Sequence, residues 1–310
     1  MSRIVVLGAG VFGVTAALAL HRRGHSVTLV DPGPLPRPEA ASTDVSKIVR
    51  LDYGADEIST RLMEQALPRW RAWNEDSGRT LFHEDGLLVL TEGPPRPGSF
   101  EADSFALLRR LGHSLQPLDR AELRRRFPAW GESAFDGGYF NPQGGWAESA
   151  AVMAWLVGRA RAAGVELREG AAGLRLLERG VELAGAAGGP GERLSGDAVL
   201  VAAGAWTPLL LPELAGLIAV VGQPVLHFRP GELWRWRAPQ FPPYTADVGR
   251  TGFYGFPALP DGTLKLAHHG AGRPVHPDAP REVEAGDEAR FRQFLARALP
   301  GLGQPPLESS

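Results

Sequence analysis

The chain has 310 residues, long enough for two domains with hydrophobic cores, and its 44% hydrophobic and 22% charged residues are typical of a soluble globular protein. A formal net charge of −2 gives no electrostatic reason to expect nucleic acid or an anionic membrane as a partner. Cysteine is absent, which excludes disulfides, zinc–thiolate sites, iron–sulfur clusters and a cysteine nucleophile, and which fits a cytoplasmic protein.

The N-terminal elements predict a β-α-β unit. Ile4–Leu7 is a β-branched run typical of a buried strand, Val11–Arg23 has helical spacing and stops at Gly24, and Ser26–Val30 predicts the next strand. The apolar stretch Ile4–Leu20 imitates a signal peptide or membrane helix, but its glycines stand at loop spacing and no cleavage-like end follows. We therefore expect a buried strand and helix there, and no membrane segment.

The remaining elements predict a second, different sheet. Helices are expected at Glu57–Asp76, Phe105–Leu111, Asp119–Phe127, Gly145–Ala163 and Asp287–Leu299, and strands at Leu87–Leu90, Val165–Leu167 and Ala198–Ala202. Residues 218–269 hold several strand-like runs with little helix, which favours a mainly antiparallel sheet. The expected fold class is α/β for the N-terminal domain, and α+β for the chain as a whole because the second domain has a mainly antiparallel sheet. A Rossmann-like domain would comprise residues 1–85 and 145–217, a second domain residues 86–144 and 218–300, and residues 301–310 would begin a further segment of the first domain.

A glycine motif follows the first strand. In this motif, Gly8 permits the tight turn, Gly10 lets the backbone approach a pyrophosphate, and Gly13 allows the helix to pack closely on the strand. Asp31 ends the second strand at the right distance to accept hydrogen bonds from a ribose diol. The residues predicted to bind a dinucleotide are Gly8, Ala9, Gly10, Val11, Phe12, Gly13 and Asp31. At this point NAD and FAD both remain open.

A second motif favours FAD. The apolar strand at Val199–Val201 runs into small residues that let backbone come close to a cofactor. With the glycine motif, it resembles the second nucleotide-contacting strand of FAD-dependent oxidoreductases. The resemblance adds Ala203, Gly204 and Trp206 to the predicted FAD contacts. It makes residues 1–85 and 145–217 the expected FAD-binding domain, with 301–310 the start of a further FAD-domain segment, and residues 86–144 and 218–300 the expected substrate domain.

Two further segments are ambiguous from their residues alone. ASTDVSKIVRLDYG, residues 41–54, could line a flavin and substrate cavity or form a surface loop with scattered charges. In LKLAHH, Lys265 alternates with Leu264 and Leu266, so it would point to solvent or into a polar cavity, on the same face as His269. An exposed edge-strand lysine and a surface loop are the simpler interpretations of these two patterns.

Both segments, together with FYGFP at residues 253–257, resemble the sarcosine oxidase and fructosyl-amino-acid oxidase branch of the D-amino-acid-oxidase-like flavoproteins. The resemblance implies that Arg50 binds a substrate carboxylate and that Lys265 faces the flavin, where its charge would stabilise superoxide during reoxidation. Tyr254 and His269 would wall the cavity. Ser42, Thr43 and Lys47 would contact FAD, with Lys47 standing where many members have arginine.

Members of that branch continue for several dozen residues beyond the point that matches Ser310, and their tail normally supplies a cysteine for covalent flavin attachment. We therefore expect a truncated product or fragment, with FAD bound non-covalently. No metal site is expected.

The predicted function is oxidation of a secondary amine or N-substituted amino acid by hydride transfer to FAD, with O₂ as acceptor and H₂O₂ as product. The alternatives are a dehydrogenase with another electron acceptor, an inactive truncated flavin-binding remnant and, more remotely, an NAD-linked dehydrogenase.

Overall fold

The computed structural model describes residues 1–94, 96–184, 190–303 and 305–309, and the chain divides into two units. The first unit contains Met1–Val45, Glu148–Val220 and His276–Asp278, and the second contains Ser46–Ala147, Val221–Val275 and Ala279–Ser310.

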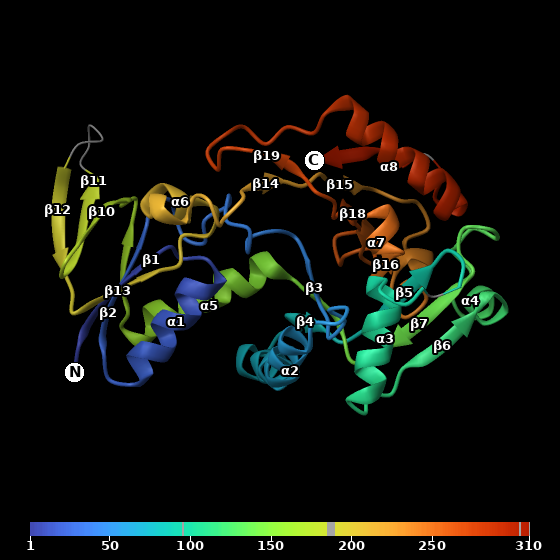
Figure 1. The fold of residues 1–310 in the computed structure, drawn as a ribbon, viewed down its shortest axis with the longest axis horizontal. Coiled ribbons are helices and arrows are strands. Elements are labelled where there is room, and N and C mark those ends of the chain that lie inside the picture. The colour runs from blue at the N-terminus through green and yellow to red at the C-terminus, as the bar shows by residue number, and fades with distance from the viewer. Residues whose placement is uncertain (95, 185–189, 304, 310) are drawn as a thin grey trace. The chain divides into compact units, whose positions relative to one another are not determined.

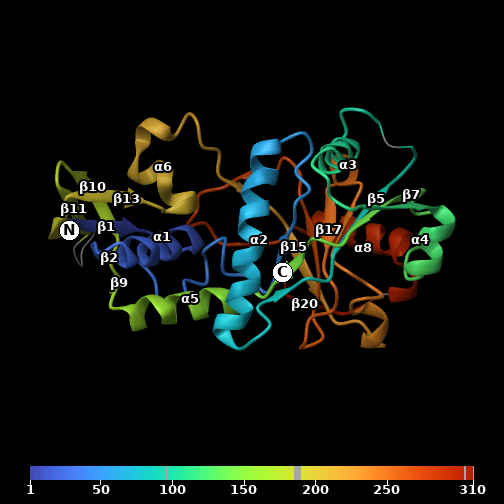
Figure 2. The same ribbon diagram turned by 90° about the horizontal axis from the view of Figure 1, so that it is seen from below.

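A parallel sheet forms the centre of the first unit. Its strand order is β13-β1-β2-β9, formed by β1 (Arg3–Leu7), β2 (Ser26–Asp31), β9 (Glu166–Glu169) and β13 (Ala198–Val201). The helices α1 (Val11–Arg22) and α5 (Ser149–Ala163) lie side by side against this sheet (Figures 1 and 2). The β1-α1-β2 unit is therefore confirmed.

A small antiparallel sheet completes the first unit. It consists of β10 (Gly173–Leu177), β11 (Gly180–Ala184) and β12 (Pro190–Ser195), in that order. Buried Val181 and Leu183 of β11 pack against Val5 and Leu7 of β1 and Val30 of β2, which joins the two sheets through one core. After β13 come the short helices η1 (Gly204–Trp206), α6 (Thr207–Leu210) and η2 (Pro212–Leu214).

The second unit is built on an eight-stranded sheet of order β20-β15-β18-β17-β16-β5-β7-β6 (Figure 1). Its neighbours pair antiparallel except for the parallel pair β16–β5. The strands are β5 (Leu87–Thr91), β6 (Gln116–Asp119), β7 (Gly137–Asn141), β15 (Val225–Phe228), β16 (Tyr244–Ala246), β17 (Phe253–Gly255), β18 (Leu264–His268) and β20 (Leu307–Ser309). This mainly antiparallel sheet was predicted, and the fold class is confirmed.

Helices and two small sheets surround that large sheet. The helices are α2 (Glu57–Ser77), α3 (Phe100–Arg110), α4 (Arg120–Arg126), α7 (Val248–Thr251) and α8 (Ala285–Ala298), with short turns η3 (Leu233–Trp236) and η4 (Pro300–Leu302). Phe291, Phe294 and Leu295 of α8 join the core formed by the sheet. One small sheet has the order β3-β8-β4, from β3 (Lys47–Val49), β8 (Gly145–Ala147) and β4 (Phe82–His83); the other pairs β14 (Val221–Gly222) with β19 (Arg273–Pro274).

The helix expected at Gly145–Ala163 is wrong in its first residues. Gly145–Ala147 forms β8, and the helix begins only at Ser149. Trp146 pairs with Ile48 of β3 and His83 of β4, and its indole stacks on the His83 ring at 4.1 Å between ring centroids. Cross-strand pairing and this aromatic contact override the helical periodicity.

The boundaries of the two units also differ from the expected domains. Residues 46–85 lie in the second unit rather than with residues 1–45, because β3 and β4 both pair with β8. Residues 307–309, expected in a further FAD-domain segment, add β20 to β15 of the second unit. The functional assignment of the two domains stays a prediction. None of the helices in the described ranges has the length and apolar composition needed to span a bilayer.

Candidate functional site

The glycine loop between β1 and α1 is tightly enclosed at two of its three glycines. Gly8 has φ +99°, and a Cβ there would lie 2.4 Å from the carbonyl oxygen of Ala202. A Cβ on Gly13 would lie 1.8 Å from the carbonyl oxygen of Gly8. A Cβ on Gly10, in contrast, would meet only Ser42 Oγ, at 3.3 Å. Gly8 and Gly13 therefore allow close packing, whereas Gly10 keeps space open beside the loop.

Asp31, the last residue of β2, is 3% exposed and holds this loop in place. Its Oδ2 accepts a hydrogen bond from Ala9 N at 2.8 Å, and its Oδ1 accepts one from Gly33 N at 3.0 Å. An ionised carboxylate has about four acceptor positions, so two protein bonds leave capacity for the hydroxyls of a ribose. The predicted role of Asp31 thus fits its geometry, and the residue has a structural role in addition.

Ser42 lies against the N-terminus of α1, and Thr43 follows it in the chain. Val11 N donates a hydrogen bond to Ser42 Oγ at 3.2 Å. Thr43 Oγ1 is buried and makes no hydrogen bond within the described part of the chain. Phe12, the second residue of α1, leaves 81% of its surface exposed. The first-turn amides of a helix have no acceptor within the helix, so this N-terminus suits a phosphate group.

The second nucleotide motif reaches the same part of the first unit. Ala203, Gly204 and Trp206 follow β13, and Ala202 N donates to Leu7 O at 2.7 Å, so the motif begins beside the glycine loop. The Trp206 indole donates to Asp278 Oδ1 at 2.6 Å, and the Arg37 guanidinium stands 4.0 Å above its ring. Arg37 Nη1 is in turn 3.9 Å from Asp31 Oδ1. The residues present therefore fit the nucleotide end of FAD.

Lys265 occupies the interior of the second unit. It lies on β18 between β15 and β17, with 1% of its surface exposed, so the exposed edge-strand interpretation is wrong. Its Nζ donates a hydrogen bond to the carbonyl oxygen of Ser46 at 2.7 Å and stands 4.7 Å from the centroid of the Phe256 ring. Strand alternation correctly places the side chain of Lys265 on the opposite face of β18 from Leu264 and Leu266, but both faces of this strand are buried. A buried ammonium in such a position is a candidate functional group.

Tyr254 and His269 have different environments. Tyr254 is half-buried and packs with Trp146, Phe256 and Leu259, so the structure brings it into the same cluster as the ring beneath Lys265. His269 is exposed and lies beyond the end of β18, with its backbone N donating to Gly252 O at 2.6 Å. Strand alternation does not extend to His269, and its predicted place on the Lys265 face has no support in the structure.

Arg50 follows β3 and is held by aromatic rings. Its guanidinium lies 5.0 Å from the centroid of the Tyr53 ring and 5.0 Å from that of Phe100. Lys47 opens the same strand, opposite Ala147, and Ser46 immediately before it is the partner of Lys265. Sequence reasoning missed Ser46, Phe100 and Phe256 as contributors, because single serine and phenylalanine residues carry no spacing signal.

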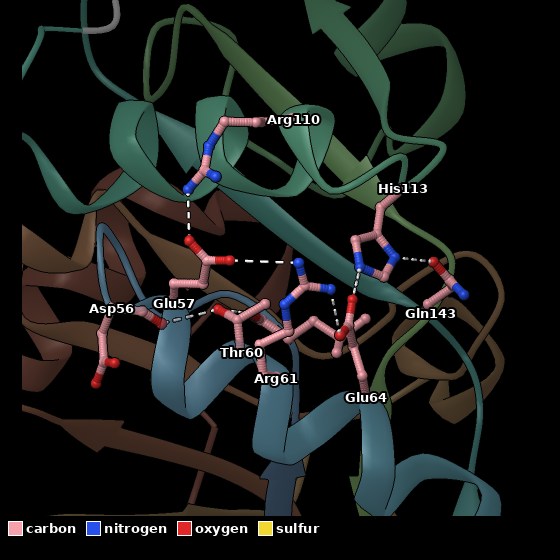
Figure 3. A network of polar contacts seen from close by, with 9 residues as sticks. Asp56, Glu57, Thr60, Arg61, Glu64, Arg110, His113 and Gln143 are labelled. Carbon is pink, nitrogen blue, oxygen red and sulfur yellow. Dashed lines mark hydrogen bonds and ion pairs between the residues drawn. The ribbon is translucent and has the colours of Figure 1, made fainter.

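Glu64 of α2 belongs to a polar network beside a cavity that Leu51, the residue after Arg50, also lines. Figure 3 shows the imidazole of His113 between two oxygen atoms, with Nε2 2.8 Å from Glu64 Oε1 and Nδ1 2.7 Å from Gln143 Oε1. Burial raises the pKa of Glu64, but the hydrogen bonds from His113 and Arg61 outweigh it and leave that pKa lowered. A cavity of about 280 Å³ is lined here by Leu51, Glu64, Leu67, Pro68, Arg71, His113 and Gln143.

Comparison with known proteins places these features in a family. The model of the family described as "FAD dependent oxidoreductase" matches residues 3–309. Monomeric sarcosine oxidase of Bacillus sp. (strain B-0618) is 26% identical over 305 residues, which cover 96% of this chain and 77% of that protein. D-amino acid dehydrogenase of Dechloromonas aromatica (strain RCB) is 28% identical over 284 residues, which cover 72% of this chain and 66% of that protein. The solved structure of fructosyl peptide oxidase from E. terrenum superposes with a TM-score of 0.81 at 20% identity, covering 99% of this chain and 77% of that one.

These similarities agree with the sarcosine oxidase and fructosyl-amino-acid oxidase branch that the sequence resembles, and they confirm FAD as the cofactor over NAD. The glycine loop, Asp31 and the N-terminus of α1 fit the nucleotide part of such a cofactor. The chain belongs to the family of FAD-dependent oxidoreductases.

Proposed function

We propose that this protein oxidises the CH–NH bond of a secondary amine or N-substituted amino acid, with non-covalently bound FAD as the immediate acceptor and O₂ as the final one. When bound, FAD supplies the acceptor for a hydride from the amine carbon. The first unit would bind the nucleotide through the glycine loop, Asp31 and Trp206, and the second unit would supply the residues that bind the amine. The similarity to sarcosine, fructosyl peptide and D-amino acid enzymes supports this substrate class.

The observation that carries the proposal is the arrangement of two cations along β3. Ser46, just before this strand, accepts a hydrogen bond from the buried Lys265, and Arg50, just after it, lies 5.0 Å from the centroids of two aromatic rings. A planar guanidinium can bind a carboxylate in a bidentate manner through its edge. A buried ammonium can stabilise negative charge that develops on O₂ as it accepts electrons. Together they fit the binding of an anionic amine substrate and its oxidation.

The experiment that tests this function begins with the visible spectrum of the desalted protein. Flavin bands are expected, and acid precipitation should release the flavin into the supernatant because no cysteine is available to bind it covalently. Anaerobic mixing with sarcosine, proline, pipecolate and a fructosyl amino acid should then bleach the flavin with at least one of them. A yellow protein that none of these amines reduces would favour the inactive remnant.

A specific observation keeps one alternative open, which is electron transfer to another acceptor. One relative is a D-amino acid dehydrogenase rather than an oxidase. An oxygen electrode separates the two: O₂ uptake with formation of H₂O₂ supports the oxidase, and reduction of a dye without O₂ uptake supports the dehydrogenase. A location in the cytoplasm stays a prediction from the cysteine-free sequence.

The glycine loop gives a prediction that does not depend on the substrate. Gly10→Ala should leave the fold intact but weaken FAD binding by roughly tenfold or more, because a methyl group would occupy the space beside the loop. Gly13→Ala should destabilise the first unit, since its Cβ would collide with the Gly8 carbonyl. Flavin fluorescence titration measures the first effect and thermal unfolding the second.

Gly158→Ala is the matched control. Gly158 lies in α5, and a Cβ there meets nothing within 4 Å. Alanine in this helical position should stabilise the protein by about 0.5–1 kcal/mol and leave FAD affinity unchanged. Unchanged FAD affinity in Gly10→Ala would contradict the assignment of this loop to the cofactor.

A further inference from the structure

Arg37 follows β2 in the first unit, and the proposed function assigns it no role. Its guanidinium carbon lies 4.0 Å from the centroid of the Trp206 ring, and its Nη1 stands 3.9 Å from Asp31 Oδ1. Arginine side chains are mostly exposed, but this one is only 14% exposed. Its stem packs against Gly33, where a Cβ would lie 3.2 Å from Arg37 Cγ. Arg37 is therefore a largely buried cation beside the carboxylate that is predicted to bind a ribose.

The contact between Arg37 and Trp206 joins segments that follow two different strands of the parallel sheet. β1 lies between β13 and β2, and all three run parallel, so their carboxyl ends lie at one edge of the sheet. The glycine loop leaves β1 at this edge, Trp206 follows β13 on one side of it, and Arg37 follows β2 on the other. Ligands of open parallel sheets bind outside the carboxyl ends of the strands. The pair therefore connects the two segments that flank the glycine loop.

Trp206 is itself held in place. Its indole Nε1 donates a hydrogen bond to Asp278 Oδ1 at 2.6 Å. Asp278 belongs to the short stretch His276–Asp278, which is part of the first unit although the chain on either side of it is part of the second. Asp278 N donates in turn to His276 Nδ1 at 3.3 Å. A hydrogen bond at the indole nitrogen fixes the orientation of the ring on which the guanidinium lies.

The charge of an anionic cofactor gives a reason for a cation beside Asp31. FAD carries negative charge on its pyrophosphate, and the carboxylate of Asp31 would repel it. The N-terminus of α1 offers only the partial positive charge of a helix dipole. Arg37 offers a full positive charge. Its other carboxylate partner, Glu39, lies 3.3 Å from Nε but has a 53% exposed side chain, so water screens that pair.

We propose that Arg37 is a cofactor-binding residue: held by Trp206 next to Asp31, its guanidinium binds the anionic adenosine diphosphate half of FAD, and Asp278 is the positioning residue for Trp206. The proposal rests on the proposed function for FAD as the bound nucleotide, and it adds Arg37 and Asp278 to the nucleotide site. It concerns binding by the first unit and does not depend on the chemistry of the amine.

The test measures binding of FAD and of ADP to the full-length protein, by flavin fluorescence and by isothermal titration calorimetry. Arg37→Ala should weaken both ligands by roughly tenfold or more, because both contain the adenosine diphosphate half. Since the contribution is one of charge, added salt should weaken ADP binding to the parent more steeply than ADP binding to Arg37→Ala. Loss of an arginine that only packs would leave this salt dependence unchanged. Arg37→Lys keeps the charge and should recover part of the affinity.

Arg159→Ala is the matched control. The Arg159 guanidinium lies 5.2 Å from the centroid of the Trp155 ring on α5, so this change also removes an arginine–tryptophan contact from the first unit. Because α5 leads into β9, the second half of this helix, which contains Arg159, lies towards the amino ends of the strands and away from the glycine loop. This variant should bind FAD and ADP as the parent does.

Two further comparisons keep the test decisive if Arg37→Ala fails to fold. Arg37→Gln keeps the polar side chain, removes its charge, and should lose affinity and salt dependence in the same way. Asp278→Ala removes the acceptor of the Trp206 indole and should weaken FAD binding by roughly threefold. Asp278→Asn keeps an acceptor oxygen and should bind FAD more tightly than Asp278→Ala does.

FAD and ADP affinities within about twofold of the parent in the Arg37 variants would overturn the proposal. Tighter binding would also overturn it, because Arg37 would then compete with the cofactor for Asp31. An equal loss in Arg159→Ala would assign the effect to the fold of the first unit. If the parent and the variants bound both ligands as expected but no amine reduced the flavin, the proposed function would fail while the role of Arg37 would stand.

Discussion

Replacing Lys265 by methionine should slow reoxidation of the reduced flavin by O₂ by roughly a hundredfold or more, and should slow its reduction by an amine far less. The reason is electrostatic: O₂ gains negative charge as it accepts electrons, and a fixed ammonium in a water-excluded position stabilises that charge without reorganisation. Lys265 is buried, and its Nζ is held by the Ser46 carbonyl over the Phe256 ring. Methionine is one atom shorter than lysine, keeps most of the unbranched side chain and removes its charge.

Stopped-flow absorbance measures both half-reactions separately, under anaerobic conditions for reduction and after mixing with O₂ for reoxidation. Lys265→Arg is the charge-retaining control and should recover part of the reoxidation rate, limited by the larger guanidinium in a closed site. Circular dichroism and flavin content must match the parent in both variants. Equal slowing of the two half-reactions in Lys265→Met would remove this role and point to general disruption of the site.

The sequence predicts the first unit well because its signals are local. The β-branched run of β1, the glycine loop and the helical spacing of α1 lie within some twenty residues, and Asp31 closes the next strand. The spacing of the glycines indicates where a side chain would not fit, and the structure agrees at Gly13, where a Cβ would collide with the Gly8 carbonyl oxygen. Such a unit can be predicted from spacing alone, because strand, turn and helix follow one another without long-range partners.

The second unit depends on partners far apart in the sequence. Trp146 forms part of a strand although its sequence pattern is helical, because it pairs with Ile48 of β3 and His83 of β4. Strand alternation separates Lys265 from Leu264 and Leu266 but cannot show that both faces of β18 are covered. The central position of β18 between β15 and β17 and the contacts of Lys265 with Ser46 and Phe256 bury the lysine.

Asp52 shows the same limit at the candidate site. It stands in the segment KIVRLDYG, where it reads as one scattered charge, and its partner Tyr139 lies 87 positions further on. His269 shows the opposite error, since alternation was extended past the point where β18 ends. The sequence identifies candidate functional residues within one short segment. It does not identify the residues distant in the chain that form hydrogen bonds with them.

Replacing Arg50 by lysine should weaken binding of a carboxylate-bearing amine by roughly thirtyfold or more, about 2 kcal/mol, although the positive charge is retained. The ammonium of lysine cannot form two parallel hydrogen bonds to a carboxylate and makes a poorer contact with the rings of Tyr53 and Phe100. Dissociation constants from anaerobic flavin reduction measure the effect. Binding of the matched amine without a carboxylate, such as piperidine against pipecolate, should change less than about threefold, because that amine never contacts Arg50.

Arg126→Lys is the matched control for this change. Arg126 also stacks over two phenyl rings in the second unit, so its replacement imposes a similar packing loss away from the proposed site. Both amines should bind this variant as they bind the parent. If Arg50→Lys weakened pipecolate and piperidine equally, Arg50 would act on the fold and not on the carboxylate. An unchanged affinity for both would place the carboxylate elsewhere.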